Sequence, residues 1–197
     1  MKIKEVLSAL ERFAPLPLQE SWDNAGLQVG LTETEVSGAL LCLDVTERIV
    51  DEAVRKGCNL IVSHHPLLFR GLKTISDLTD VQRTVMKAIE RHVCVVSMHT
   101  NMDNAPGGVN FKIAEKLRLQ EVRFMAEKKV VGIEAGSGIV GELREPMASD
   151  DFVLLVKNTF DVECAMCNEL LHRPIARVAV CGAAKKIAYD IIKRSNA

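Results

Sequence analysis

The feature that most constrains the fold is an alternation between short apolar runs and segments of helical periodicity. The run at 39–43 is apolar on both parities, which is typical of a strand covered on both faces, and Thr46 and Gly57 can cap and end a helix after it. The other predicted elements of this pattern are strands at 60–63 and 93–98 and helices at about 81–89 and 109–117. Because strands that alternate with amphipathic helices form largely parallel sheets, the order predicts an α/β fold with a mainly parallel sheet flanked by helices.

Other segments are predicted on either side of this pattern. Apolar residues at helical spacing predict a helix at about 3–13, and no strand is predicted in the polar, glycine-marked stretch 21–30. From about residue 121 the sequence becomes glycine-punctuated and β-rich, as expected for a smaller α+β segment. Within it we expect a helix ending at Phe160, a strand at 175–180 and a short helical tail. We therefore divide the chain into an α/β domain, 1–120, and a smaller α+β segment, 121–197.

Charge and hydropathy exclude several classes of partner. Lys and Arg total 25 against 26 Asp and Glu, so there is no broad cationic face for a nucleic acid or an anionic membrane. No apolar run approaches the roughly 20 residues that a bilayer crossing needs. The amphipathic first residues do not resemble a signal peptide, and six cysteines in a chain with its own core are expected to be reduced thiols. We expect a cytoplasmic protein that binds neither nucleic acid nor membrane.

The residues that carry chemistry follow the second and third predicted strands. His64 and His65 come directly after one strand, and His99 and Asp103 follow the next, so a parallel sheet would bring them to one edge. Imidazole nitrogens and a carboxylate suit a divalent ion such as zinc, iron, manganese or cobalt. Adjacent histidines on an extended backbone start in opposite directions, which favours two ions bridged by Asp103. The alternative is that each histidine only makes a hydrogen bond at a loop start.

Three motifs in register also carry a family resemblance. The segments 22–30 (WDNAGLQVG), 63–67 (SHHPL) and 99–103 (HTNMD) resemble the N-terminal signatures of the Ngg-interacting-factor-three-like family, also called type-two homologues of GTP cyclohydrolase I. The resemblance implies two α/β domains, a dinuclear metal site inside a ring-shaped hexamer, and a proposed metal-dependent hydrolase activity on a small molecule. The family's metal ligands carry over to His64, His65 and Asp103. His99 matches a position near the metals and is a weaker candidate ligand.

The sequence departs from the family pattern after Gly182. Family members continue to a late helix whose His and Glu complete the metal site, whereas no His or Glu follows Gly182 here. We therefore expect a chain that is shortened relative to the family and that holds fewer than two ions firmly. Two functions stay open at this point. One is a hydrolase acting on GTP or a phosphoester, in which metal ions activate water. The other is a non-catalytic oligomeric scaffold or regulatory protein with a degenerate metal site.

Three further features of the sequence have less specific interpretations. Asp44 and Thr46 end the strand at 39–43, at the same edge as the histidines, and Thr46 is interpreted as a helix cap. The spacing of Cys164 and Cys167 lacks a second CxxC and is interpreted as structural. Trp22, Asp23 and Asn24 can form a loop facing a substrate, or an Asx turn beside a packed indole. The sequence does not decide between these two.

Overall fold

The computed structural model describes residues 1–130, 132–170 and 172–182, and its chain divides into two compact units, Met1–Met102 and Asp103–Ala197. This division falls earlier than the predicted boundary near residue 120. The reason is packing: helix α5 (Val109–Lys116) contributes Ala114 to a core cluster that also contains Phe124 and Ile139 of the second unit. The helical tail predicted after Gly182 lies outside the described residues.

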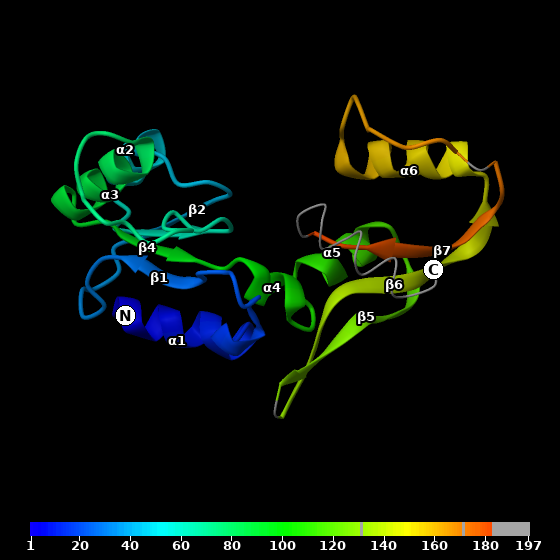
Figure 1. Ribbon diagram of the computed structural model, residues 1–197, viewed down its shortest axis with the longest axis horizontal. Helices are drawn as coiled ribbons and strands as arrows, with labels where there is room; N and C mark the ends of the chain where they lie inside the picture. Colours follow the sequence, from blue (N-terminus) through cyan, green and yellow to red (C-terminus); the bar gives the residue numbers. More distant parts are fainter. Residues whose placement is uncertain (131, 171, 183–197) are drawn as a thin grey trace. The chain divides into compact units, whose positions relative to one another are not determined.

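The first unit is built on a four-stranded sheet in the order β1-β4-β3-β2 (Figure 1). Its strands are β1 (Gly26–Val29), β2 (Ala39–Cys42), β3 (Leu60–Ser63) and β4 (Cys94–Ser97). Strands β2, β3 and β4 are parallel, which confirms the predicted α/β class, whereas β1 pairs with β4 in the antiparallel sense. Strand β1 was not predicted, because its residues lie in a polar, glycine-marked stretch without a continuous apolar run.

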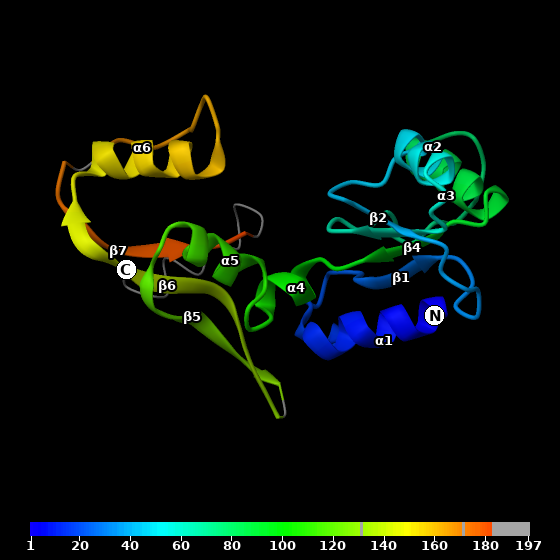
Figure 2. The ribbon, with the colours of Figure 1, turned by 180° about the vertical axis from the view of Figure 1, so that it is seen from behind.

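Helices cover both faces of this sheet. In Figures 1 and 2, α2 (Glu47–Arg55) and α3 (Asp80–Glu90) lie on one face and α1 (Ile3–Phe13) lies on the other. Alternate residues of β4 face the two layers: Val95 packs in the cluster with α2 and α3, and Val96 packs with Ile3 of α1. All four residues of β4 are therefore buried.

Strand β2 differs from the prediction of a strand covered on both faces. Leu41 is 75% exposed, although Leu40 packs against the core cluster under α2 and α3. The reason is the strand order, because β2 is an edge strand and the buried residues that pack with Ile3 of α1 come from β3 and β4. The apolar run identified the strand correctly but not its position in the sheet.

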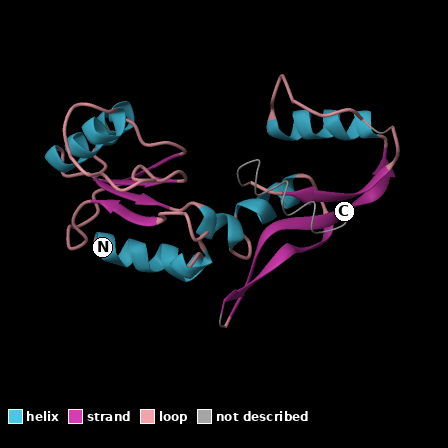
Figure 3. Cartoon of the chain, in the orientation of Figure 1, coloured by secondary structure: helices cyan, strands magenta, loops and turns pink. Residues whose placement is uncertain are grey.

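The second unit contains a three-stranded antiparallel sheet (Figure 3). Its strands are β5 (Gln120–Val130), β6 (Ile133–Met147) and β7 (Ile175–Val180), in the order β5-β6-β7. Apolar residues of α5 and of α6 (Ser149–Phe160) pack in one cluster with these strands. The shorter helices are η1 (Leu16–Leu18) and α4 (Thr100–Asn104). Among the described residues, none of the helices has the length and apolar character needed to span a membrane.

Candidate metal centre

Strand register explains why four loops of the first unit converge. Cys42, Ser63 and Ser97 are register partners at the carboxyl ends of β2, β3 and β4, so the residues after them lie at one edge of the sheet. Strand β1 runs the opposite way, and its first residue, Gly26, pairs with Ser97. The segment that precedes β1 therefore reaches the same edge, which supplies a fourth loop that the parallel strands alone would not provide.

Three histidines gather at this edge. One ring nitrogen each of His64, His65 and His99 lies within 4.8 Å of the others. The ring centroids are 5.1 Å apart for His64 and His65, 5.2 Å for His64 and His99, and 5.6 Å for His65 and His99. The predicted convergence of the two strand exits is thus present, and the three rings form a group that can hold a metal ion.

The two adjacent histidines do not diverge, in contrast to the prediction. His64 and His65 lie in a bend after β3 rather than on an extended strand. The bend is held from inside by buried hydroxyl groups: Ser63 Oγ donates to the carbonyl oxygen of His65 over 2.9 Å, and Ser97 Oγ donates to the same oxygen over 3.3 Å. Two ions were predicted for histidines on an extended backbone, which is not the conformation found here, so the number of ions stays a prediction.

Each of the three imidazoles has an acceptor at its Nδ1 atom. The partners are the carbonyl oxygen of Met98 for His64 at 2.9 Å, Asp44 Oδ1 for His65 at 2.8 Å and Asp23 Oδ1 for His99 at 2.7 Å. A carbonyl or carboxylate oxygen can only accept, so a neutral imidazole bonded in this way donates from Nδ1 and has its lone pair on Nε2. Metal-binding histidines in proteins are oriented by the same kind of partner. The donor set therefore fits a divalent transition metal ion.

Asp23 is the most strongly held of these partners. Its side chain is fully buried, and its carboxylate accepts hydrogen bonds from the backbone N–H of Asn24 and Thr100, from the Thr100 hydroxyl and from His99. Burial would by itself raise the pKa of Asp23, but these hydrogen bonds outweigh it and lower the pKa to about 2. Asp23 is therefore a carboxylate at neutral pH, and it orients the His99 ring through the hydrogen bond at Nδ1.

Asp44 occupies the equivalent position at His65 in a more open setting. The two side chains are 65% and 45% exposed respectively, so water screens their interaction. The position of Asp44 at this edge was predicted from the sequence, but its contact with His65 was not. Asp23 was predicted to be either a residue of a loop facing a substrate or part of an Asx turn. The available signal was the position of Asp23 within the motif at 22–30, but only the pairing of β1 shows what it contacts.

Asp103, the fourth predicted ligand, begins the second unit and is buried there. Its carbonyl oxygen accepts a hydrogen bond from Asn110 Nδ2 at 2.9 Å, and Asn110 Oδ1 accepts one from the backbone N–H of Gly182 at 2.7 Å. A Cβ atom at Gly182 would lie 3.5 Å from Asp103 Oδ1. The exit of β7 therefore packs closely beside Asp103 within this unit. Its role as a metal ligand stays a prediction.

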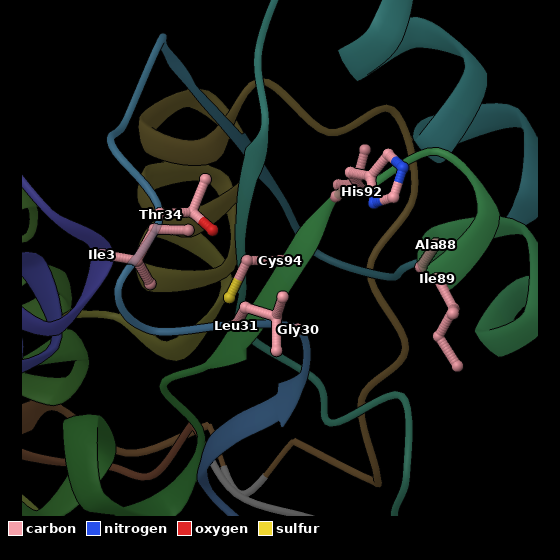
Figure 4. A pocket seen from close by; sticks show the side chains of 9 residues that line it. Ile3, Gly30, Leu31, Thr34, Ala88, Ile89, His92 and Cys94 are labelled. Atoms are coloured by element: carbon pink, nitrogen blue, oxygen red, sulfur yellow. The ribbon is translucent and has the colours of Figure 1, made fainter.

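A separate cavity of about 560 Å³ lies in the first unit (Figure 4). Figure 4 shows that Ile3, Leu31, Ile89, His92 and Cys94 are among its lining residues, and none of the three clustered histidines is. Burial raises the pKa of the Cys94 thiol to about 11, so this group stays protonated at neutral pH. The cavity is therefore a poor candidate for the predicted metal chemistry.

Comparison with known proteins supports the resemblance noted in the sequence. A family model described as Duf34/NIF3 (NGG1p interacting factor 3) matches residues 1–196. A Clostridium perfringens protein named GTP cyclohydrolase 1 type 2 homolog is 35% identical over 200 residues, covering 98% of this chain and 76% of that protein. The Clostridium acetobutylicum protein of the same name is 34% identical over 163 residues, covering 83% of this chain but only 61% of that protein.

A solved structure has a similar fold. The crystal structure of a Bacillus cereus protein related to NIF3 superposes with a TM-score of 0.90 at 23% identity, covering all of this chain and 80% of that one. At this level of identity the likeness concerns the fold alone.

Proposed function

Because the chain belongs to the Duf34/NIF3 family, we propose that it binds a divalent transition metal ion at His64, His65 and His99. The observation that carries this proposal is the hydrogen bond at Nδ1 of each of the three rings. These bonds orient the rings and leave the lone pair of each neutral imidazole on Nε2, where a metal ion can bind. Zinc, iron, manganese and cobalt all suit imidazole or mixed imidazole and carboxylate ligands. Asp103 remains the predicted carboxylate ligand on the strength of the resemblance.

The test compares metal binding across all five histidines of the chain. His64→Asn, His65→Asn and His99→Asn each remove one imidazole, while His92→Asn and His172→Asn are matched controls outside the cluster. Asparagine is chosen because His92 and His172 have φ values of +55° and +48°, a region that asparagine tolerates better than most residues. We expect zinc content after dialysis to fall in the three cluster variants and to stay at the wild-type level in both controls. Equal zinc in all six proteins would contradict the proposal.

Asp103→Asn tests the fourth ligand in the same assay. We expect zinc affinity to fall by more than the roughly 10- to 100-fold loss that removal of an orienting partner causes, because a direct ligand would be removed. Zinc affinity that is unchanged in Asp103→Asn, with normal behaviour of the histidine variants, would remove Asp103 from the ligand set and leave the histidine site in place.

We further propose that the activity served by this site is hydrolysis of a small molecule. A bound divalent ion supplies Lewis-acid chemistry, lowering the pKa of water to near neutrality. The three imidazoles would bind this ion, and Asp44 and Asp23 orient two of them. The site is accessible to a substrate, since His65 is 45% exposed. Assays of GTP and of phenyl phosphate, each with added manganese, zinc or cobalt, distinguish a hydrolase that acts on GTP from one that acts on a phosphoester. Metal binding without turnover of either substrate would instead favour the non-catalytic scaffold or regulatory role.

We also propose, from the family resemblance, that the chain self-associates, with the family's hexamer as the expected assembly. Leu41 on the edge strand β2 is 75% exposed and Leu43 directly after it is 57% exposed, and exposed apolar groups on an edge strand favour pairing with another chain. Sedimentation at micromolar concentration tests this. A single monomeric species would contradict it.

A further inference from the structure

Two large aromatic side chains lie exposed beside the histidine cluster. Trp22, the single tryptophan of the chain, is 46% exposed, and Phe69 is 45% exposed. Their ring centroids are 5.9 Å apart, and they lie 6.2 Å and 6.4 Å respectively from the ring of His99. Large apolar surface left in contact with water next to a group of potential metal ligands is characteristic of a binding site.

The two rings are carried by loops that are tied to each other. Asn24 Nδ2 donates to the carbonyl oxygen of Leu68 over 2.6 Å, and the backbone N–H of Leu68 donates to Gln28 Oε1 over 3.0 Å. Gln28 Nε2 in turn donates to the carbonyl oxygen of Asn24 over 2.7 Å. The residues next to Trp22 and Phe69 are thus joined before any ligand arrives. A preformed surface of this kind loses little conformational entropy on binding.

The Trp22 loop is also fixed to the metal centre. Asp23, the next residue, bonds both to His99 and to the backbone N–H of Thr100. These bonds fix the position of the Trp22 indole relative to the His99 imidazole within the first unit. Because both aromatic rings lie within 6.4 Å of the His99 ring, a ligand whose polar group reaches His99 has the two rings within its reach.

We propose that Trp22 and Phe69 bind a planar unsaturated ring of a small molecule whose polar group is held at the histidine cluster. This inference rests on the proposed metal site. Aromatic rings favour offset-stacked or edge-to-face contacts with another ring by more than the burial of their area alone provides. A saturated ring of similar size offers apolar area but no flat face, so it should bind less tightly.

The test uses the full chain loaded with zinc and three probes that share one anionic group: phenylphosphonate, cyclohexylphosphonate and methylphosphonate. Isothermal titration measures each affinity, and the fluorescence of Trp22 is recorded with the wild-type protein. We expect phenylphosphonate to bind about tenfold more tightly than cyclohexylphosphonate, a ratio equivalent to about 1.4 kcal/mol. We also expect the fluorescence of Trp22 to change with phenylphosphonate and much less with methylphosphonate.

Two variants and one control assign this preference to the aromatic pair. In Trp22→Leu and Phe69→Leu we expect the ratio of phenyl to cyclohexyl affinity to fall toward one. Phe13→Leu is the matched control, because Phe13 is a 50% exposed phenylalanine at the end of α1. It should retain the wild-type ratio.

Zinc content, measured on every protein before titration, distinguishes a failure of the proposed metal site from a failure of the inference about Trp22 and Phe69. A wild-type chain that binds no zinc would overturn the proposed metal site and this inference with it. A chain that binds zinc but does not distinguish phenyl from cyclohexyl would overturn only the inference. The same holds if the two leucine variants keep the phenyl preference. The exposed pair would then be better explained as a contact surface for another protein.

Discussion

Replacing Asp23 by asparagine should destabilise the first unit in a way that depends on pH. The wild-type carboxylate accepts bonds at both oxygens, whereas an amide places an NH2 group where at least one donor now points. The pKa of Asp23 is lowered from 3.8 to about 2, and each pKa unit corresponds to about 1.4 kcal/mol. The charged form therefore contributes about 2 kcal/mol to the free energy of unfolding, without a discount for exposure because the side chain is buried.

The sign of the pH dependence follows from the lowered pKa. The contribution is fully present above the unfolded-state pKa of about 4, and it is lost as the pH falls through the folded-state pKa of about 2. The difference in unfolding free energy between wild type and Asp23→Asn should therefore be about 2 kcal/mol at neutral pH and shrink below pH 4. Urea unfolding followed by Trp22 fluorescence measures it in the first unit, since no other tryptophan is present.

Asp44→Asn is the matched control for this experiment. It changes the same group opposite another clustered histidine, but Asp44 is 65% exposed, so we expect a loss of at most about 1 kcal/mol. If Asp23→Asn were as mild as Asp44→Asn, or if its effect did not vary between neutral pH and pH 3, the assignment of Asp23 as a buried, hydrogen-bonded carboxylate would be refuted.

Other substitutions test the packing, the helix caps and the thiols. Ile61→Ala, fully buried in the sheet, should cost about 2–5 kcal/mol in denaturant unfolding. Leu41→Ala on the exposed edge strand should change the stability of the monomeric chain by less than about 0.5 kcal/mol, so both are measured at dilution where the chain is monomeric; similar losses in the two would contradict the strand order. Thr79→Ala removes the capping box at the start of α3, where Thr79 Oγ1 accepts from the backbone N–H of Gln82, and should cost about 1 kcal/mol; a neutral result would argue against this cap. Labelling with iodoacetamide at neutral pH, followed by mass spectrometry, tests the thiols. The exposed Cys164 and Cys167 should be labelled rapidly, and the buried Cys94, with its raised pKa, only after unfolding. Rapid labelling of native Cys94 would disprove its burial.

The repeating elements of the first unit could be predicted from local pattern. Each parallel strand is a short apolar run, and each helix between them has an apolar stripe and a capping residue such as Thr46, whose side chain accepts from the N–H of Ile49. Parallel strands exit at one edge, so the convergence of His64 and His65 with His99 also followed from the sequence. These features depend on periodicity and direction, which a sequence displays.

Only the tertiary structure decided what surrounds the histidines. The antiparallel pairing of β1 with β4 brings Asp23 to His99 across 76 positions of the chain, and local periodicity contains no information about such a pairing. The bend after β3 depends on a hydroxyl contact of 2.8 Å between Ser63 and Ser97, which lie on neighbouring strands. The exposure of Leu41 depends on β2 being an edge strand. Sequence determined which side chains are available for a metal site, while long-range backbone pairing determined their orientation, because a partner's position in space is fixed by the whole sheet.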